Sequence, residues 1–248
     1  MSVPDALVLL GAVAAGFVQG LSGFAFALLA TVFWSPALPP QVSAPLIALC
    51  SVAGQVLSVR SVWPSLDLRR AAPMVLGGVA GVPLGVALLP WLDPVWFRGG
   101  VGLLLVVYCP AMLMARRLPR VRGGVWGDMA AGWVGGVMGG IGGLAGPAPT
   151  LWCMLRGWDR DTQRAVFQTF LVVAQTAALV GYVVTGTVTA EVGWIAAWVL
   201  PCVLLPSFAG TLLYARIGAE GFRRVVLVLL FLTGLMLVTQ AVPGILAR

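Results

Sequence analysis

Glycines and small polar residues interrupt two long apolar stretches of this sequence, and the interruptions have the composition of a ligand site. The first is GFVQGLSGF at 16–24, inside a run without charged side chains from Ala6 to Trp34. The second is GGIGGLAGPAP at 139–149. Because glycine is a poor helix former, we expect each helix to break there. The second half of a broken helix begins with free N–H groups, which bind anions without any cationic side chain.

Neutral polar side chains accompany these glycines. The stretches VAGQ at 52–55 and VVAQ at 172–175 place Gln55 and Gln175 at corresponding positions. A glutamine in a membrane either bonds a neighbouring helix or donates to a ligand, and glycines either expose the backbone or permit close helix packing. Both alternatives stay open, although packing is favoured for the GxxxGxxxG pattern at 77–85. The residues that the sequence predicts for an anion site are Gln19, Ser22, Gly23, Gln55, Gly142, Gly143, Gly146, Gln168, Thr169 and Gln175.

The composition excludes several kinds of chemistry. The sequence contains no His, so histidine metal sites and histidine catalysis are excluded. Its four Cys lie far apart in apolar runs and are expected to be small buried hydrophobes. No Asp, Glu, Lys or Arg falls clearly in the middle of an apolar run, which argues against a proton relay and against an acid–base enzyme. We therefore predict no catalytic residue, no metal site and no cofactor.

The elements that position these residues must be membrane helices. The chain of 248 residues is 60% hydrophobic, has a mean hydropathy of +1.01 and is 9% charged, against about 25% charged residues in soluble domains. Several uncharged runs reach the roughly 20 residues that a spanning helix needs, and the alternating strands of a barrel are missing. The apolar segments are 5–34, 41–60, 71–91, 95–115, 125–155, 162–185, 190–215 and 222–246.

The arginines indicate how the two longest segments meet the membrane. As one straight helix, residues 5–34 would be about 45 Å long, against a hydrocarbon core of about 30 Å, and 125–155 are similar. If all eight segments crossed, the 15 arginines would divide eight to seven. If these two segments are hairpins, 13 arginines share one face and two lie on the other. The positive-inside rule favours the second arrangement and accounts for the basic charge without nucleic-acid binding. We therefore predict six spanning helices, two re-entrant hairpins and both termini outside the cytoplasm.

The two halves of the sequence repeat each other. AAGFVQG at 14–20 matches AAGWVGG at 130–136, and GVALLPWLDPVWFR at 85–98 matches GTLLYARIGAEGFR at 210–223. Each unit has the order hairpin, helix, helix, helix, and three crossings per unit turn the second unit upside down. Inverted repeats are typical of transporters that bind substrate near the midplane, where helices are broken. The predicted units are 1–122 and 123–248.

These stretches together resemble the TauE/SafE family of sulfite exporters. The resemblance is carried by GFVQGLSGFAFALLA at 16–30, by GWVGGVMGGIGGLAGPAP at 132–149 and by SLDLRRAAPMVLGGVAGVPLGVALLPWLDP at 65–94. It implies export of sulfite or of small organosulfonates such as sulfoacetate. The sequence departs from the family pattern at Ala25 and Ala27, where the first copy often has glycine, and no proline follows that copy at 31–33. The closest backbone approach to an anion is therefore expected at the second break.

The sequence as a whole predicts an all-α integral membrane protein that is a secondary transporter. It would export a small anion across the bacterial inner membrane, with the lipid bilayer as its surroundings and no nucleic-acid partner. An anion channel and a non-transporting membrane subunit are the alternatives, and the sequence is compatible with a homodimer. The coupling ion and the substrate are left open.

Overall fold

The computed structural model describes residues 5–22, 25–59, 68–114, 120–158 and 160–214, and in the last segment residues 224, 227–228, 230–232, 234–235, 237–239 and 241–242. All regular structure in this part of the chain is helical, which confirms the predicted all-α class. The described residues of the last segment are helical as well. The other helices are α1 (Ala6–Ser22), α2 (Phe26–Trp34), α3 (Pro40–Val59), α4 (Leu68–Leu88) with the 3₁₀ turn η2 (Leu89–Trp91), α5 (Pro94–Met114), α6 (Gly124–Gly142), α7 (Pro147–Leu155), α8 (Arg160–Val184) and α9 (Ala190–Tyr214).

Four of the described helices are long and apolar enough to cross a membrane. They are Arg69–Trp91, Pro94–Met114, Ala165–Val184 and Ala190–Leu212. Their lengths of 20 to 23 residues match the span of about 20 residues that a bilayer requires. The chain is therefore a multi-pass membrane protein. The apolar part of α3 is shorter, and the last predicted helix lies partly outside the described residues, so the number six stays a prediction.

Each of the two longest apolar segments forms two helices. The first segment divides between Ser22 and Phe26, and the second divides between Gly142 and Pro147. Gly143 ends α6 in the left-handed conformation, with φ of 70°, which glycine adopts at little cost. Pro147 begins α7, where its missing N–H costs the helix nothing. Both breaks fall where the sequence predicts them.

Both helix pairs fold back on themselves. The indole Nε1 of Trp34, at the end of α2, donates to the carbonyl of Val8 near the start of α1, at 2.9 Å. In the second pair, the N–H of Val121, just before α6, donates to the carbonyl of Leu155 at the end of α7, at 2.8 Å. The second half of each pair therefore ends beside the place where the first half begins.

Glycines allow two pairs of helices to pack with their backbones in contact. On α4, a Cβ at Gly81 would lie 2.3 Å from the carbonyl oxygen of Trp133, and on α6 a Cβ at Gly136 would lie 2.1 Å from that of Gly78. The same relation holds along this interface at Gly77, Gly85, Gly132 and Gly140. These contacts confirm the packing role predicted for the glycines of 77–85. Helices α1 and α9 pack similarly, because a Cβ at Gly16 would lie 2.5 Å from the carbonyl oxygen of Val203.

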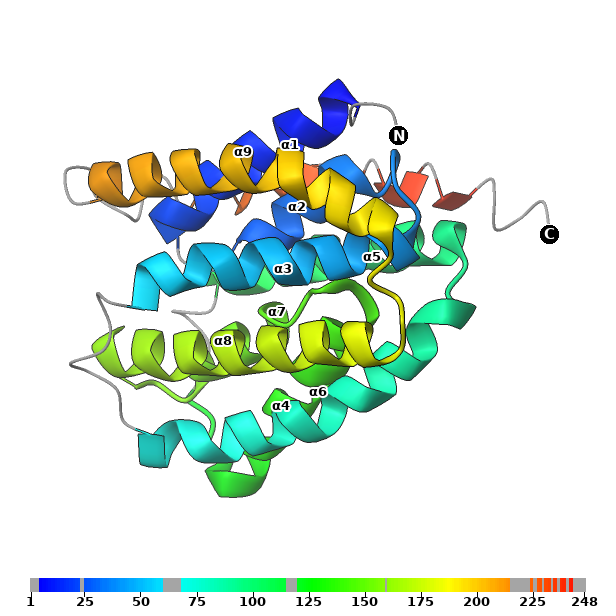
Figure 1. Cartoon of the computed structure of the whole chain (residues 1–248). Helices are drawn as coiled ribbons and strands as arrows, with labels where there is room; N and C mark the ends of the chain where they lie inside the picture. The colour runs from blue at the N-terminus through cyan, green and yellow to red at the C-terminus, as the bar shows by residue number, and fades with distance from the viewer. Residues whose placement is uncertain are drawn as a thin grey trace.

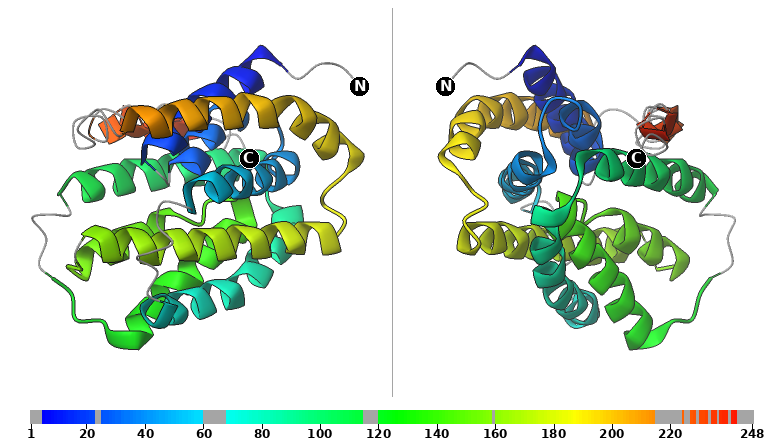
Figure 2. Two further views of the ribbon diagram at one scale, coloured as in Figure 1. Left: turned by 60° about the vertical axis from the view of Figure 1, so that its left-hand side comes forward. Right: turned by 90° about the vertical axis from the view of Figure 1, so that its right-hand side faces the viewer.

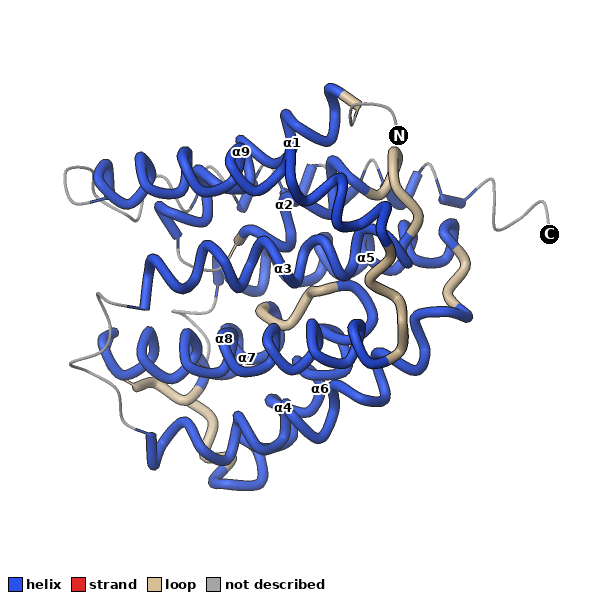
Figure 3. Tube along the Cα trace, in the orientation of Figure 1, coloured by secondary structure: helices blue, strands red, loops and turns tan. Residues whose placement is uncertain are grey.

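Helices α3 and α8 lie side by side in the middle of the molecule (Figure 1). In that view α1 and α9 lie above them, and α4 and α6 lie below. The ends of α3 and α9 and the starts of α4 and α8 are at one end of the molecule, on the left of Figure 1. Two turned views show the same order of helices from the side (Figure 2). The break between α6 and α7 is drawn as a loop between α3 and α8 (Figure 3), so this part of the predicted anion site lies beside the central pair of helices.

Candidate functional site

Helix α8 holds the second break through hydrogen bonds from two of its side chains to the backbone of that break. The amide Nε2 of Gln175 donates to the carbonyl of Gly143. About two turns further on, the hydroxyl of Tyr182 donates to the carbonyls of Gly139 and Gly140 at 3.1 and 2.7 Å. Gly140 and Gly143 lie at the C-terminal end of α6, where carbonyls have no partner within the helix, whereas Gly139 also accepts from the N–H of Gly143. The two side chains therefore fix the end of α6 against α8.

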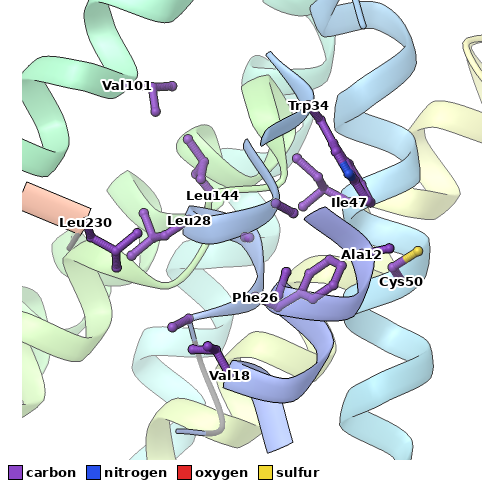
Figure 4. Close-up of a cluster of buried hydrophobic side chains, with 14 of the residues drawn as sticks. Ala12, Val18, Phe26, Leu28, Trp34, Ile47, Cys50, Val101, Leu144 and Leu230 are labelled. Carbon is purple, nitrogen blue, oxygen red and sulfur yellow. The ribbon is translucent and has the colours of Figure 1, made fainter. Parts of the chain in front are cut away.

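Helix α3 covers the second break from another side. A Cβ on Gly143 would lie 2.5 Å from Cγ2 of Ile47 and 3.4 Å from the carbonyl oxygen of Ala44. Leu144 of this break and Leu28 of α2 belong to one buried cluster, which also includes Ile47 (Figure 4). The second break and the start of α2 are therefore parts of the same packed interior.

The first break lies beside the middle of α3. The side chain of Gln19, near the end of α1, is 2% exposed, and its Nε2 donates to the carbonyl of Ser51 at 3.3 Å. Its amide fits against Gly54, where a Cβ would lie 2.6 Å from Nε2. The carboxamide of Gln19 is therefore held on α3 one turn beyond the level at which Gly143 contacts that helix.

Helices α2 and α7, which follow the two breaks, differ in the number of backbone donors at their N-termini. In α2 the N–H groups of Phe26, Ala27 and Leu28 donate to no group in the described part of the chain, and all three residues are buried. In α7 the corresponding positions include Pro147 and Pro149, so only Ala148 has an N–H to offer. A buried N–H without a partner costs free energy, and a ligand that accepts hydrogen bonds removes that cost. The larger set of backbone donors is therefore at the first break, and the closest backbone approach to an anion, which is expected at the second break, stays a prediction.

Four glutamines bring unpaired carboxamide oxygens to the same interior. Gln19, Gln55, Gln168 and Gln175 are 2%, 6%, 4% and 1% exposed. The Oε1 atom of each has no hydrogen-bond partner among the described residues, and neither has the Nε2 atom of Gln168. Buried polar atoms without partners are uncommon in proteins, and each one calls for a physical explanation.

The remaining predicted residues take various positions. Gly142 is the last residue of α6, and the N–H of Gly143 donates to Gly139 at 2.8 Å, so that donor is in use. Gly146 precedes α7 and accepts from the N–H and the hydroxyl of Thr150. The hydroxyl of Thr169 donates to Ala165 within α8 at 2.7 Å. Ser22 ends α1, but its side chain and the whole of Gly23 lie outside the described residues.

An ion pair that was not predicted from the sequence closes the base of the second hairpin. Arg156 places Nε 3.1 Å from Oδ1 of the buried Asp128, and Trp152 donates to the same oxygen at 2.7 Å. The guanidinium also lies 5.2 Å from the ring centre of Trp158. Asp128 and Arg156 occur at opposite ends of the predicted hairpin, so folding that segment back on itself would have brought them together.

A comparison with protein-family models decides the family. The model described as sulfite exporter TauE/SafE matches residues 8–237, which include both breaks and the helices around them. The chain belongs to the sulfite exporter TauE/SafE family. This TauE/SafE membership confirms the resemblance seen in the sequence and assigns the protein to a family of membrane transporters. No match was found among curated proteins or among solved structures. Among the described residues, no group of three or more His, Cys, Asp or Glu could hold a metal ion.

Proposed function

We propose that this TauE/SafE protein exports sulfite, or an organosulfonate such as sulfoacetate, across the bacterial inner membrane. The observation that supports this most directly is the row of buried N–H groups at Phe26, Ala27 and Leu28. Oxyanions accept several hydrogen bonds at once, and the positive end of a helix dipole stabilises their charge. The site would bind its substrate through neutral donors, so the anion could leave without breaking a salt bridge.

The second set of donors would come from the opposite hairpin. The N–H of Ala148 and that of Gly146 have no partner in the described part of the chain. The Nε2 atom of Gln168 is likewise unpaired and buried. In the proposed site the anion lies between α2 and α7, and Gln168 completes its shell from α8. The other predicted residues would shape the backbone around it.

The proposed architecture is a pair of inverted repeats, each with one re-entrant hairpin. It is supported by corresponding packing partners, because α1 packs on α9 as α6 packs on α4, while α3 packs on α8. It is also supported by the return of α2 to the start of α1 and of α7 to the start of α6. Residues 1–122 and 123–248 would be the two units. With this topology both termini face the periplasm.

The direct test is anion efflux from liposomes that contain the purified protein. Vesicles are loaded with sulfite, and efflux is followed with and without an inside-negative potential. We expect saturable efflux that the potential accelerates, since about 2.3 kcal/mol per charge is available for each 100 mV. Sulfoacetate should compete, whereas chloride should not. Absence of efflux from folded protein, for every anion tried, would contradict the proposal.

The same preparation separates the carrier from its alternatives. A current far above carrier turnover in a planar bilayer would identify an anion channel. A membrane subunit without transport activity of its own would give no flux and would co-purify with a fixed partner. The buried donors at α2 favour the carrier, because a site that holds its anion by several hydrogen bonds releases it slowly.

A further inference from the structure

Four buried glutamine oxygens lack a hydrogen-bond partner among the described residues, and an anion does not provide one. Two of them have an orientation fixed by chemistry, because the Nε2 atoms of Gln19 and Gln175 face the carbonyls of Ser51 and Gly143. A carbonyl accepts hydrogen bonds only, so the atom that faces it must be the amide nitrogen. The oxygen of each carboxamide therefore points elsewhere, and it lacks a donor among the described residues.

The glutamines, or the backbone groups that they contact, lie along the middle of α3 and α8. The amide of Gln19 lies at Ser51 and Gly54 of α3, next to Gln55. Gln175 reaches the break at Gly143, which contacts α3 at Ile47. All these α3 positions fall within about two helical turns, or roughly 11 Å.

The register of the two central helices brings in the fourth glutamine. Ala44 and Ala48 of α3 share a buried cluster with Ala178 and Tyr182 of α8. Since Gln175 reaches the level of Ile47 through Gly143, further residues of α3 face earlier residues of α8. Counted along this antiparallel pair, Gln55 then lies close to the level of Gln168. Gln168 is two turns before Gln175 and lies on nearly the same face of α8.

An anion alone does not satisfy these atoms. A carboxamide oxygen carries partial negative charge and repels the oxygens of a sulfite or sulfonate group. Its natural partners are hydrogen-bond donors and hard cations, which proteins bind through carbonyl oxygens. The carbonyl end of α6 at Gly143 adds the negative end of a helix dipole. In transporters with broken helices, such carbonyl ends are where a coupling cation binds.

The absence of a nearby carboxylate among the described residues limits the charge of any cation that the glutamine oxygens could bind. Asp128 is the buried carboxylate in the described part of the chain, and it is 15 residues before Gly143 on α6, which corresponds to about 22 Å. The glutamine oxygens therefore act without a carboxylate beside them. Neutral dipoles compensate the dehydration of one positive charge more readily than that of two, so a monovalent cation fits.

We propose that a monovalent cation of the size of Na⁺ binds to the carboxamide oxygens of Gln55, Gln168 and Gln175, beside Gln19. Gln168 is the key ligand, because neither of its amide atoms is bonded and the side chain can turn. The cation lies next to the anion donors of α2 and α7. The pair of ions then crosses the membrane with less net charge than the anion alone. The cation site stands by itself, whereas its coupling to export rests on the proposed function.

Binding of ²²Na⁺ to the purified protein, without any anion, tests the site. We expect saturable binding that choline does not displace and that Gln168→Met weakens at least tenfold. Methionine has a similar volume and removes a buried amide without a partner, so the variant should fold and keep its melting temperature. Gln55→Met is the second test variant. Gln41→Met is the matched control, since Gln41 lies on α3 but donates to Leu89 and Leu92 outside this cluster.

The results distinguish the cation site from the proposed transport. Lack of saturable ²²Na⁺ binding to folded protein, or equal binding by wild type and both test variants, overturns the inference. In liposomes we expect sulfite efflux to rise at least tenfold when internal choline is replaced by Na⁺. Efflux that follows pH and ignores Na⁺ also overturns it, because the oxygens would then accept a proton carried by the anion. If Na⁺ binds but no anion moves, the site stands and the proposed function fails.

Discussion

The carboxamide of Gln175 has one atom with a structural role and one atom without a partner in the described part of the chain. Its nitrogen holds the carbonyl of Gly143 at the second break, and its oxygen is left for another partner. In the proposed site, the fold depends on the nitrogen of this amide, whereas ligand binding depends on its oxygen. The exposed fraction of 1% excludes water as an easy substitute.

We expect Gln175→Ala to slow sulfite efflux by at least tenfold while the protein stays folded. Loss of the bond to Gly143 should cost about 1 kcal/mol, in the range measured for hydrogen bonds between membrane helices. Efflux and the thermal transition in detergent are measured together, with Gln41→Ala as the control. Unchanged efflux would remove Gln175 from the site.

Asp128 is the residue for which substitution should cost the most stability. We expect Asp128→Ala to lower the free energy of unfolding by about 3 kcal/mol, because Arg156 and the indole of Trp152 lose their common partner. Chemical denaturation in micelles measures it. The double variant with Arg156→Ala should cost less than the sum of the two single variants, whereas additive losses would show that the pair is not coupled.

At the scale of the helices, glycines rather than large side chains set the contacts. The interface between α4 and α6 has no room for a methyl group at Gly81, where a Cβ would meet a backbone carbonyl at 2.3 Å. A backbone carbonyl cannot turn aside as a flexible side chain can. The interface therefore requires glycine, although alanine is the better helix former by about 1 kcal/mol.

Gly81→Ala should consequently destabilise the protein, and Gly193→Ala should not. Nothing lies within 4 Å of a Cβ at Gly193 on α9, so that change should be neutral or stabilising by up to about 1 kcal/mol. Thermal unfolding in one detergent compares the two variants. Equal transitions would mean that α4 and α6 separate easily.

The elements could be derived from the sequence more completely than the site. Apolar length predicted the helices with described bounds to within a few residues, and the glycines at 20–24 and 139–149 located both breaks. The backbone donors at Phe26, Ala27 and Leu28 were not predicted, because apolar side chains indicate packing and say nothing of the N–H groups behind them. The sequence does contain a signal for the difference, since Pro147 and Pro149 remove two donors from the first turn of α7 and no proline stands at 26–28.

Side-chain partners across the fold were beyond the sequence for a different reason. The fit of Gln19 against Gly54 depends on the angle between α1 and α3, which no local pattern encodes. The bond from Tyr182 to Gly139 and Gly140 depends on how α8 lies against the end of α6. The sequence could identify buried glutamines as candidates, but only the packing showed which of their atoms lack partners.

At the scale of the whole molecule, the topology can be tested with single cysteines at 122, 157 and 187 in a background without the four native cysteines. We expect 187 to react with a reagent that cannot cross the membrane in intact cells, and 122 and 157 to be protected. The reason is that the N–H of Val121 donates to the carbonyl of Leu155, so the two ends of the second hairpin lie together, and in the proposed topology both are cytoplasmic. Eight full crossings would instead place 122 and 157 on opposite sides, and labelling of only one of them would contradict the hairpin.

The glycine contacts along α4 and α6, and along α1 and α9, also have a mechanical consequence. Two helices joined backbone to backbone at successive turns cannot slide past each other, so each pair should behave as a rigid lever. Motion between the levers must then be absorbed at the seam of α3 and α8, where alanines and glutamines meet. Spin-label distances within a lever should stay constant during transport, while those between levers should change. The residues that bind the ions would thus be the residues that the two levers turn about.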